Sequence, residues 1–153
     1  MRPGNRPGRG TVLAWLCVVV WIAAIQAFAS DSFSANETSR FIGQLLRWLS
    51  FDADAQWVAT VHLAIRKTAH FVEYAILALL VLRAFRMNFD RRLAWLAAAS
   101  LVLTLVVAVV DESRQAAAAN RTGALSDVAL DMGGAVSALA LASAVRRLGS
   151  LRK

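Results

Sequence analysis

The chain has few of the residues that soluble enzymes use for chemistry. Its 153 residues include one cysteine, Cys17, and two histidines, His62 and His70. A lone cysteine cannot form an intrachain disulfide and has no metal-ligand spacing. His62 and His70 are too far apart on a helix to share one local site, so zinc would need further His or Cys ligands. A glycine-rich phosphate loop and a nucleophile elbow are also missing. These absences predict no cofactor and no metal, and they make an enzyme the less favoured class.

The chain also lacks the short alternating apolar runs of a soluble β-protein. Apolar residues make up 58% of it, the mean hydropathy is +0.53, and the apolar residues fall in long blocks. This pattern predicts an all-α integral membrane protein. The net charge of +7 would suit nucleic acid in a soluble protein, but most arginines flank apolar blocks. Orientation and contact with lipid headgroups explain them better, so membrane lipids are predicted as partners and nucleic acid is not.

The apolar blocks predict a four-transmembrane-helix bundle in one membrane domain, residues 11–145. Basic tails flank it at 1–10 and 146–153. The spanning helices are expected at about 11–29, 57–83, 93–111 and 126–145. An additional amphipathic helix is expected at about 36–50, between the first and second spanning helices. It would lie in the membrane interface or, as an alternative, pack like a helix of a soluble protein.

The first apolar block allows two interpretations. Ala27-Phe28-Ala29 fits the small-x-small cleavage site of a signal peptide. The apolar region is long for a signal peptide, however, and it carries Trp15 and Trp21. We therefore favour a retained helix.

The distribution of Lys and Arg predicts the orientation. Basic residues gather in 1–10, 83–92 and 146–153, whereas the connection between the first two spanning helices is net acidic. The positive-inside rule then places both termini of this multi-pass membrane protein in the cytoplasm. The polar ends of the second, third and fourth spanning helices would all face the extracytoplasmic side.

A polar face on the second spanning helix is the main candidate site. It comprises Arg66, Lys67, His70, Glu73 and Tyr74. At 100° per residue, four of these side chains lie within about a third of the helix circumference, and Lys67 borders them. A charge at membrane depth costs roughly 3 kcal/mol or more unless it is paired, so such residues are functional candidates. A chain of ion pairs that locks helix to helix is the simpler alternative.

Two later segments carry acids that could meet this face. Asp111, Glu112 and Gln115 lie at helical spacing, but adjacent acids point about 100° apart, so one is expected to face the bundle. For Glu112 we expect a solvated helix end. Asp127 complements the dipole of its helix in the first turn, whereas Asp131 lies more than a turn deeper. The small residues Gly133 and Gly134 would let another helix approach closely.

These residues together resemble the VanZ-like family. The resemblance covers roughly residues 60–140. It rests on R-K-x-x-H-F-x-E-Y from Arg66 to Tyr74, on D-E-x-x-Q from Asp111, on Arg121, and on D-x-x-x-D-x-x-G from Asp127. Local departures are Arg114, where the family often has His, and Ala119-Asn120, where it has Pro-Gly. The resemblance implies a small polytopic bacterial membrane protein, which is expected in the inner (cytoplasmic) membrane. The family name comes from a member linked to low-level resistance to the glycopeptide teicoplanin.

The leading functional hypothesis is that the polar residues bind the anionic headgroup of an envelope lipid or of a polyprenyl-linked precursor. Arg66, Lys67 and Arg121 would contact the phosphate. Glu73, Asp127 and Asp131 would position those cations or bind polar groups of the ligand. The alternatives are a structural or partner-binding scaffold, a lipid transporter with His70 and Glu73 as a proton relay, and an intramembrane enzyme. The sequence leaves the oligomeric state open.

Overall fold

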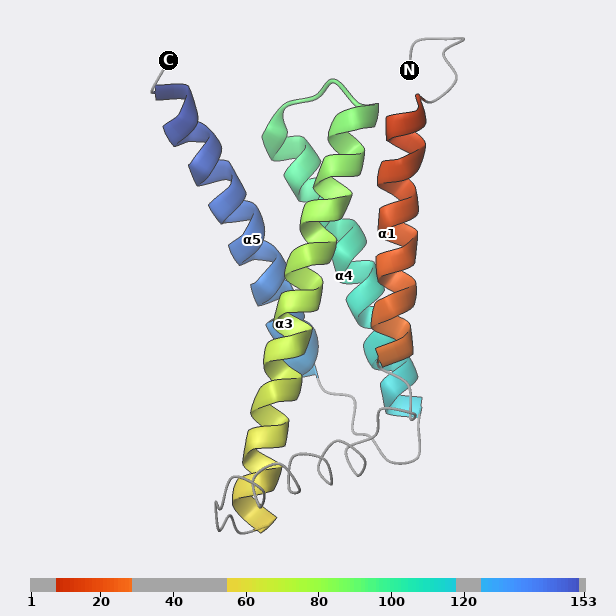
Figure 1. Ribbon diagram of the computed structural model, residues 1–153, viewed down its shortest axis with the longest axis vertical. Helices are drawn as coiled ribbons and strands as arrows, with labels where there is room; N and C mark the ends of the chain where they lie inside the picture. Colours follow the sequence, from red (N-terminus) through yellow and green to blue (C-terminus); the bar gives the residue numbers. More distant parts are fainter. Residues whose placement is uncertain (1–7, 29–54, 118–124, 152–153) are drawn as a thin grey trace.

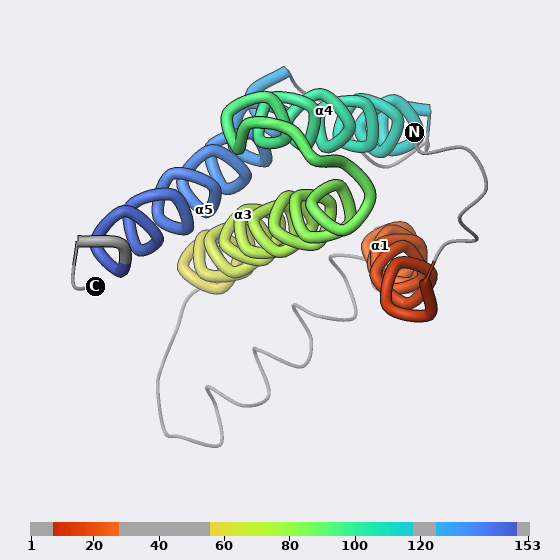
Figure 2. Tube along the Cα trace, turned by 90° about the horizontal axis from the view of Figure 1, so that it is seen from above, coloured from red at the N-terminus to blue at the C-terminus, as the bar shows by residue number. Residues whose placement is uncertain are grey.

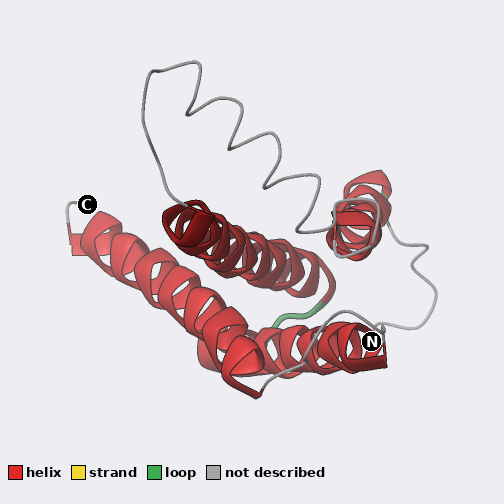
Figure 3. Cartoon of the chain, turned by 90° about the horizontal axis from the view of Figure 1, so that it is seen from below, coloured by secondary structure: helices red, strands yellow, loops and turns green. Residues whose placement is uncertain are grey.

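The computed structural model describes residues 8–28, 55–117 and 125–151, and its regular structure there is helical (Figures 1 and 3). The helices are α1 (Arg9–Phe28), α3 (Ala55–Asn88), α4 (Leu93–Ala117) and α5 (Leu125–Leu151). All four are long and apolar enough to span a membrane. The predicted all-α bundle with four spanning helices is confirmed. The amphipathic helix expected at 36–50 and the site residue Arg121 lie outside the described residues.

The outer surface of the bundle is apolar, and several polar groups are buried inside it. Large apolar side chains such as Val19, Val102 and Leu141 are more than half exposed. Asp111 and Asp131, by contrast, are almost fully buried. Such an arrangement would be costly in water, but it fits a bundle whose apolar faces contact lipid and whose polar side chains pair internally.

Helix α3 is the central element, in contact with α1, α4 and α5 (Figure 2). Its 34 residues correspond to about 51 Å, which exceeds the roughly 30 Å of a bilayer core. In Figure 1 both ends of the described chain and the turn between α3 and α4 lie at the same end of the bundle. We refer to this as the terminal end and to the other as the distal end.

Two apolar clusters hold the helices together. One joins α1, α3 and α4 through buried residues that include Val18, Ile25, Leu77 and Ala108. The other joins α3, α4 and α5, with Ala78, Leu82, Leu96, Ala135 and Leu139 as its buried residues. Together they place α3 between α1 on one side and α5 on the other.

The backbones of α5 and α3 approach closely at Gly134. A Cβ atom on Gly134 would overlap the backbone carbonyl oxygen of Phe71 and would lie 3.0 Å from its carbonyl carbon. A Cβ on the preceding Gly133 would meet only the Phe71 ring edge, at an ordinary 3.7 Å. The predicted role of small residues in close helix approach is thus confirmed, and Gly134 is the residue that permits it. Beyond this contact α5 diverges from α3 toward its C-terminus (Figure 1).

Several helix ends differ from the expected ones. The helix expected at about 93–111 is longer than predicted, because α4 continues to Ala117 with Asp111 and Gln115 buried against its neighbours. Helix α5 runs on to Leu151, so Arg146 and Arg147 belong to a helix and not to a tail. Polar side chains end an apolar block without ending the helix that carries them.

Candidate functional site

Polar side chains from all four described helices gather toward the distal end of the bundle. On α3 they follow one another over about two turns, from Arg66 to Tyr74. The acids of α4 and α5 lie beside them, near the end of α4 and the start of α5 (Figure 1). The structure therefore brings together the described residues of the three groups singled out in the sequence. We call this set the distal polar cluster.

Asp111 on α4 is the centre of the cluster. Its side chain is almost fully buried and accepts hydrogen bonds from side chains on three helices. Gln26 Nε2 of α1 donates to Oδ1 at 3.0 Å, and Gln115 Nε2 of α4 donates to Oδ2 at 2.9 Å. The Tyr74 hydroxyl of α3 donates to Oδ2 at 3.4 Å. A buried carboxylate with several donors is well compensated, so Asp111 ties α1, α3 and α4 together.

Arg66 lies one step further along this hydrogen-bonded chain. Its Nη2 donates to Oε1 of Gln115 at 2.8 Å, and Gln115 in turn donates to Asp111. Within the described residues no carboxylate forms an ion pair with Arg66. A guanidinium has five N–H donors, and an amide oxygen does not neutralise its charge. Arg66 therefore keeps both a positive charge and spare donors for a further partner.

Where α3 faces α5, two basic side chains meet the acids of α5. Lys67 Nζ lies 3.8 Å from Asp127 Oδ1, and the Lys67 side chain is 49% exposed. Asp127 lies in the first turn of α5, as predicted. One turn deeper, His70 Nδ1 lies 3.5 Å from Asp131 Oδ1, with both side chains largely buried. The geometry of this second contact does not make a hydrogen bond, so both atoms are buried without a hydrogen-bond partner.

Glu73 and Tyr74 occupy the deepest layer of the cluster. The Tyr74 side chain is fully buried, and its ring stacks near that of His70 with centroids 6.4 Å apart. The carboxylate of Glu73 is half-buried and forms no hydrogen bond or ion pair with another described residue. Its backbone carbonyl accepts a hydrogen bond from Trp21 Nε1 of α1 at 2.9 Å. Glu73 is therefore an acid at membrane depth whose side chain is open to an additional partner.

Glu112 corrects the sequence-based interpretation. It was expected at a solvated helix end, but its side chain is only 8% exposed, and Asp111 next to it is also buried. The expectation that one of the two acids faces the bundle is wrong because α4 continues for another turn beyond them. Both residues therefore lie within the helix and not at its end.

The sequence analysis did not identify the contribution of α1. Gln26 and Trp21 both donate hydrogen bonds into the cluster. Gln26 is the one carboxamide in an otherwise apolar block, and a polar side chain in a spanning helix is a functional candidate by default. These contacts make α1 an integral part of the bundle.

The fold and the cluster define a class of protein, a polytopic α-helical membrane protein with an internal polar site. No group of three or more His, Cys, Asp or Glu residues that could hold a metal ion occurs in the described parts of the chain. The family model described as VanZ/LLP1 matches residues 11–146, so the chain belongs to the VanZ/LLP1 family. The match covers nearly the whole chain and confirms the resemblance seen in the sequence. Comparison with curated proteins and with solved structures gave no match.

Proposed function

We propose that this VanZ-family membrane protein binds the headgroup of an anionic lipid, or of a lipid-linked precursor of the bacterial envelope, at the distal polar cluster. The distribution of Lys and Arg supports an inner-membrane protein with cytoplasmic termini. In that orientation the cluster faces the extracytoplasmic leaflet, where envelope precursors are used.

The observation that carries this proposal is the uncompensated positive charge of Arg66. Its partner in the bundle is the neutral amide of Gln115, so its charge is not compensated by any described carboxylate. Lys67 is half exposed beside it, and its contact with Asp127 is long. A phosphate between these two cations would gain charge-assisted hydrogen bonds where few waters compete. In this arrangement Arg66 supplies fixed donors and Lys67 a flexible one.

The acids of the cluster narrow the choice of ligand. Glu73 lies about 10 Å deeper than Arg66 along α3, and its carboxylate is open to a partner. A ligand with phosphate alone would be repelled by this carboxylate and by Asp131. A headgroup that carries hydroxyl or ammonium donors in addition to phosphate could bind Arg66 through its phosphate and donate hydrogen bonds to Glu73. Phosphosugar or aminated phospholipid headgroups have this chemistry.

Native mass spectrometry of the protein extracted in mild detergent tests the proposal. We expect wild-type protein to retain a specific phosphate-bearing lipid, and Arg66→Gln to lose it. Arg114→Gln is the matched control, because Arg114 is exposed on α4 and takes no part in the described cluster contacts. Folded Arg66→Gln protein that retains the same lipid as wild type would overturn the proposal. Arg121→Ala extends the test to the third predicted cation.

A scaffold role is the second candidate, and the Asp111 network favours it. That network links three helices with no need for a ligand. In a scaffold, neutral variants of the cluster should lose stability and leave no folded protein with a selective defect. Thermal unfolding of Glu73→Gln and Asp131→Asn in detergent separates the two cases, because a ligand site predicts folded variants without bound lipid.

The VanZ resemblance also motivates a link to glycopeptide resistance. A protein that sequesters or alters an extracytoplasmic precursor would change how much of it a glycopeptide can reach. We expect expression of the protein in a susceptible host to raise the inhibitory concentration of teicoplanin. An unchanged inhibitory concentration at confirmed expression would remove this part of the proposal.

A further inference from the structure

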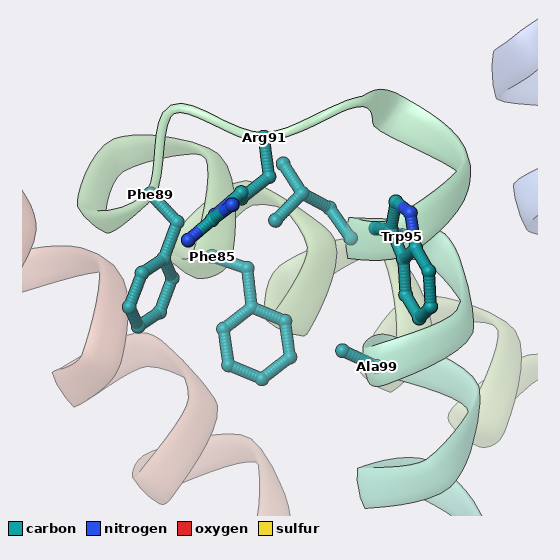
Figure 4. Close-up of a pocket in the computed structure, with 6 residues that line it drawn as sticks. Phe85, Phe89, Arg91, Trp95 and Ala99 are labelled. Carbon is teal, nitrogen blue, oxygen red and sulfur yellow. The ribbon is translucent and has the colours of Figure 1, made fainter.

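A second candidate site lies at the terminal end, away from the distal polar cluster. A cavity of about 480 Å³ opens between the end of α3, the turn that follows it, and the start of α4 (Figure 4). Its lining residues are Phe85, Phe89, Arg91, Trp95, Leu96 and Ala99. The volume lies in the range of small-ligand pockets, roughly 300–1,000 Å³.

The walls of the cavity are apolar and aromatic. The rings of Phe85 and Phe89 lie with centroids 5.9 Å apart on one side, and Trp95 stands on the opposite side (Figure 4). Trp95 is 72% exposed and Phe89 is 42% exposed. Exposed aromatic rings at the end of a spanning helix are typical of the membrane–water interface. From Trp95 to Ala99 the cavity follows α4 for about 6 Å, in the direction from that interface toward the hydrocarbon.

The mouth of the cavity carries a positive charge. Arg91 extends from the turn, and its guanidinium lies beside the two phenylalanine rings (Figure 4). No described residue forms a hydrogen bond or ion pair with the Arg91 side chain. The surrounding segment 83–92 has four arginines and a single acid, Asp90. An apolar slot with a cation at its entrance is complementary to an anionic amphiphile.

We propose that this cavity binds one anionic phospholipid from the leaflet at the terminal end. An acyl chain occupies the space between Phe85, Trp95 and Ala99, and Arg91 holds the phosphate. A lipid is the occupant because the cavity is lined by aromatic rings and aliphatic side chains, with one polar group at the depth of the headgroups. This site is independent of the distal polar cluster, which shares none of its residues.

Competition between two lipids tests the site. Purified protein in detergent is equilibrated with equal amounts of phosphatidylglycerol and phosphatidylcholine, and retained lipids are counted by native mass spectrometry. We expect wild-type protein to prefer phosphatidylglycerol. Arg91→Gln should lower the retained ratio of phosphatidylglycerol to phosphatidylcholine about five-fold, the effect of one basic residue at a membrane surface. Ala99→Phe, which fills the cavity and keeps every cation, should reduce retention of both lipids.

Two controls make the test specific. Arg86→Gln removes an exposed charge from the same end of α3 but does not line the cavity, so it should leave the ratio unchanged. The comparison of Arg91→Gln with its parent is also made in an Arg66→Gln background, so that lipid retained at the distal polar cluster does not contribute to the ratio. An equal ratio in wild type and Arg91→Gln, or an equal loss in Arg86→Gln and Arg91→Gln, would overturn the proposal in favour of unspecific surface charge.

Discussion

Asp111 receives donors from Gln26, Tyr74 and Gln115, so its carboxylate is shared by three helices. We expect Asp111→Ala to lower the free energy of unfolding by about 1–3 kcal/mol, because the truncation leaves buried donors without an acceptor. Thermal unfolding in detergent measures the effect.

The control for this prediction is Ser113→Ala, two residues further along α4. Ser113 is exposed and bonds only the backbone carbonyl of Val109 in its own helix, so its loss should change stability little. Equal melting temperatures for Asp111→Ala and wild type would show that the Asp111 network does not hold the bundle together.

At the residue scale, the sequence predicted which side chains share a face but not which partners they have. Helical spacing is local, so it placed Arg66, His70 and Glu73 on one side of α3 from the 3.6-residue period alone. The bond from Gln26 to Asp111 joins residues 85 positions apart, and no periodicity encodes such a pair. Which side chains form hydrogen bonds between helices depends on how the helices pack, and the sequence pattern does not predict that packing.

The contact between α3 and α5 is an element-scale feature that depends on one residue. We expect Gly134→Ala to destabilise the protein by about 1–3 kcal/mol, because the added methyl group meets the Phe71 carbonyl and forces the helices apart. Gly133→Ala is the matched control, since its methyl group has ordinary contact distances. Chemical or thermal unfolding of both variants provides the comparison, and equal stabilities would contradict the close approach.

The residues at which the helices end were harder to predict from the sequence than the helices themselves. Apolar blocks mark where a helix is buried in lipid, and the predicted ranges followed those blocks. Helix α4 continues beyond its block because Glu112 and Gln115 are buried against the bundle instead of facing water. The sequence alone does not separate a polar helix turn inside a bundle from a polar loop outside it.

The topology is a property of the whole molecule. With four spanning helices, the start of α1, the end of α5 and the turn between α3 and α4 lie at one end, and the start of α5 lies toward the other (Figure 1). In a Cys17→Ser background, Asp90→Cys and Ser126→Cys should therefore react with a membrane-impermeant thiol reagent from opposite sides. We expect Ser126→Cys to be labelled in intact spheroplasts and Asp90→Cys only after the membrane is opened.

Labelling of both positions from the same side would contradict the four-span topology. Labelling of Asp90→Cys alone in intact spheroplasts would keep the topology and reverse the proposed orientation. The lone native cysteine makes this experiment simple, because a single substitution removes the background signal.

The contact at Gly134 also has a mechanical consequence. It lies in the middle of the stretch of α5 that packs on α3, from Asp127 beside Lys67 to Leu139 in the apolar cluster with Leu82. The twelve residues after Leu139 extend about 18 Å further, to Leu151. A rod that is held along one half bends as a cantilever, so displacements of α5 should grow toward Leu151.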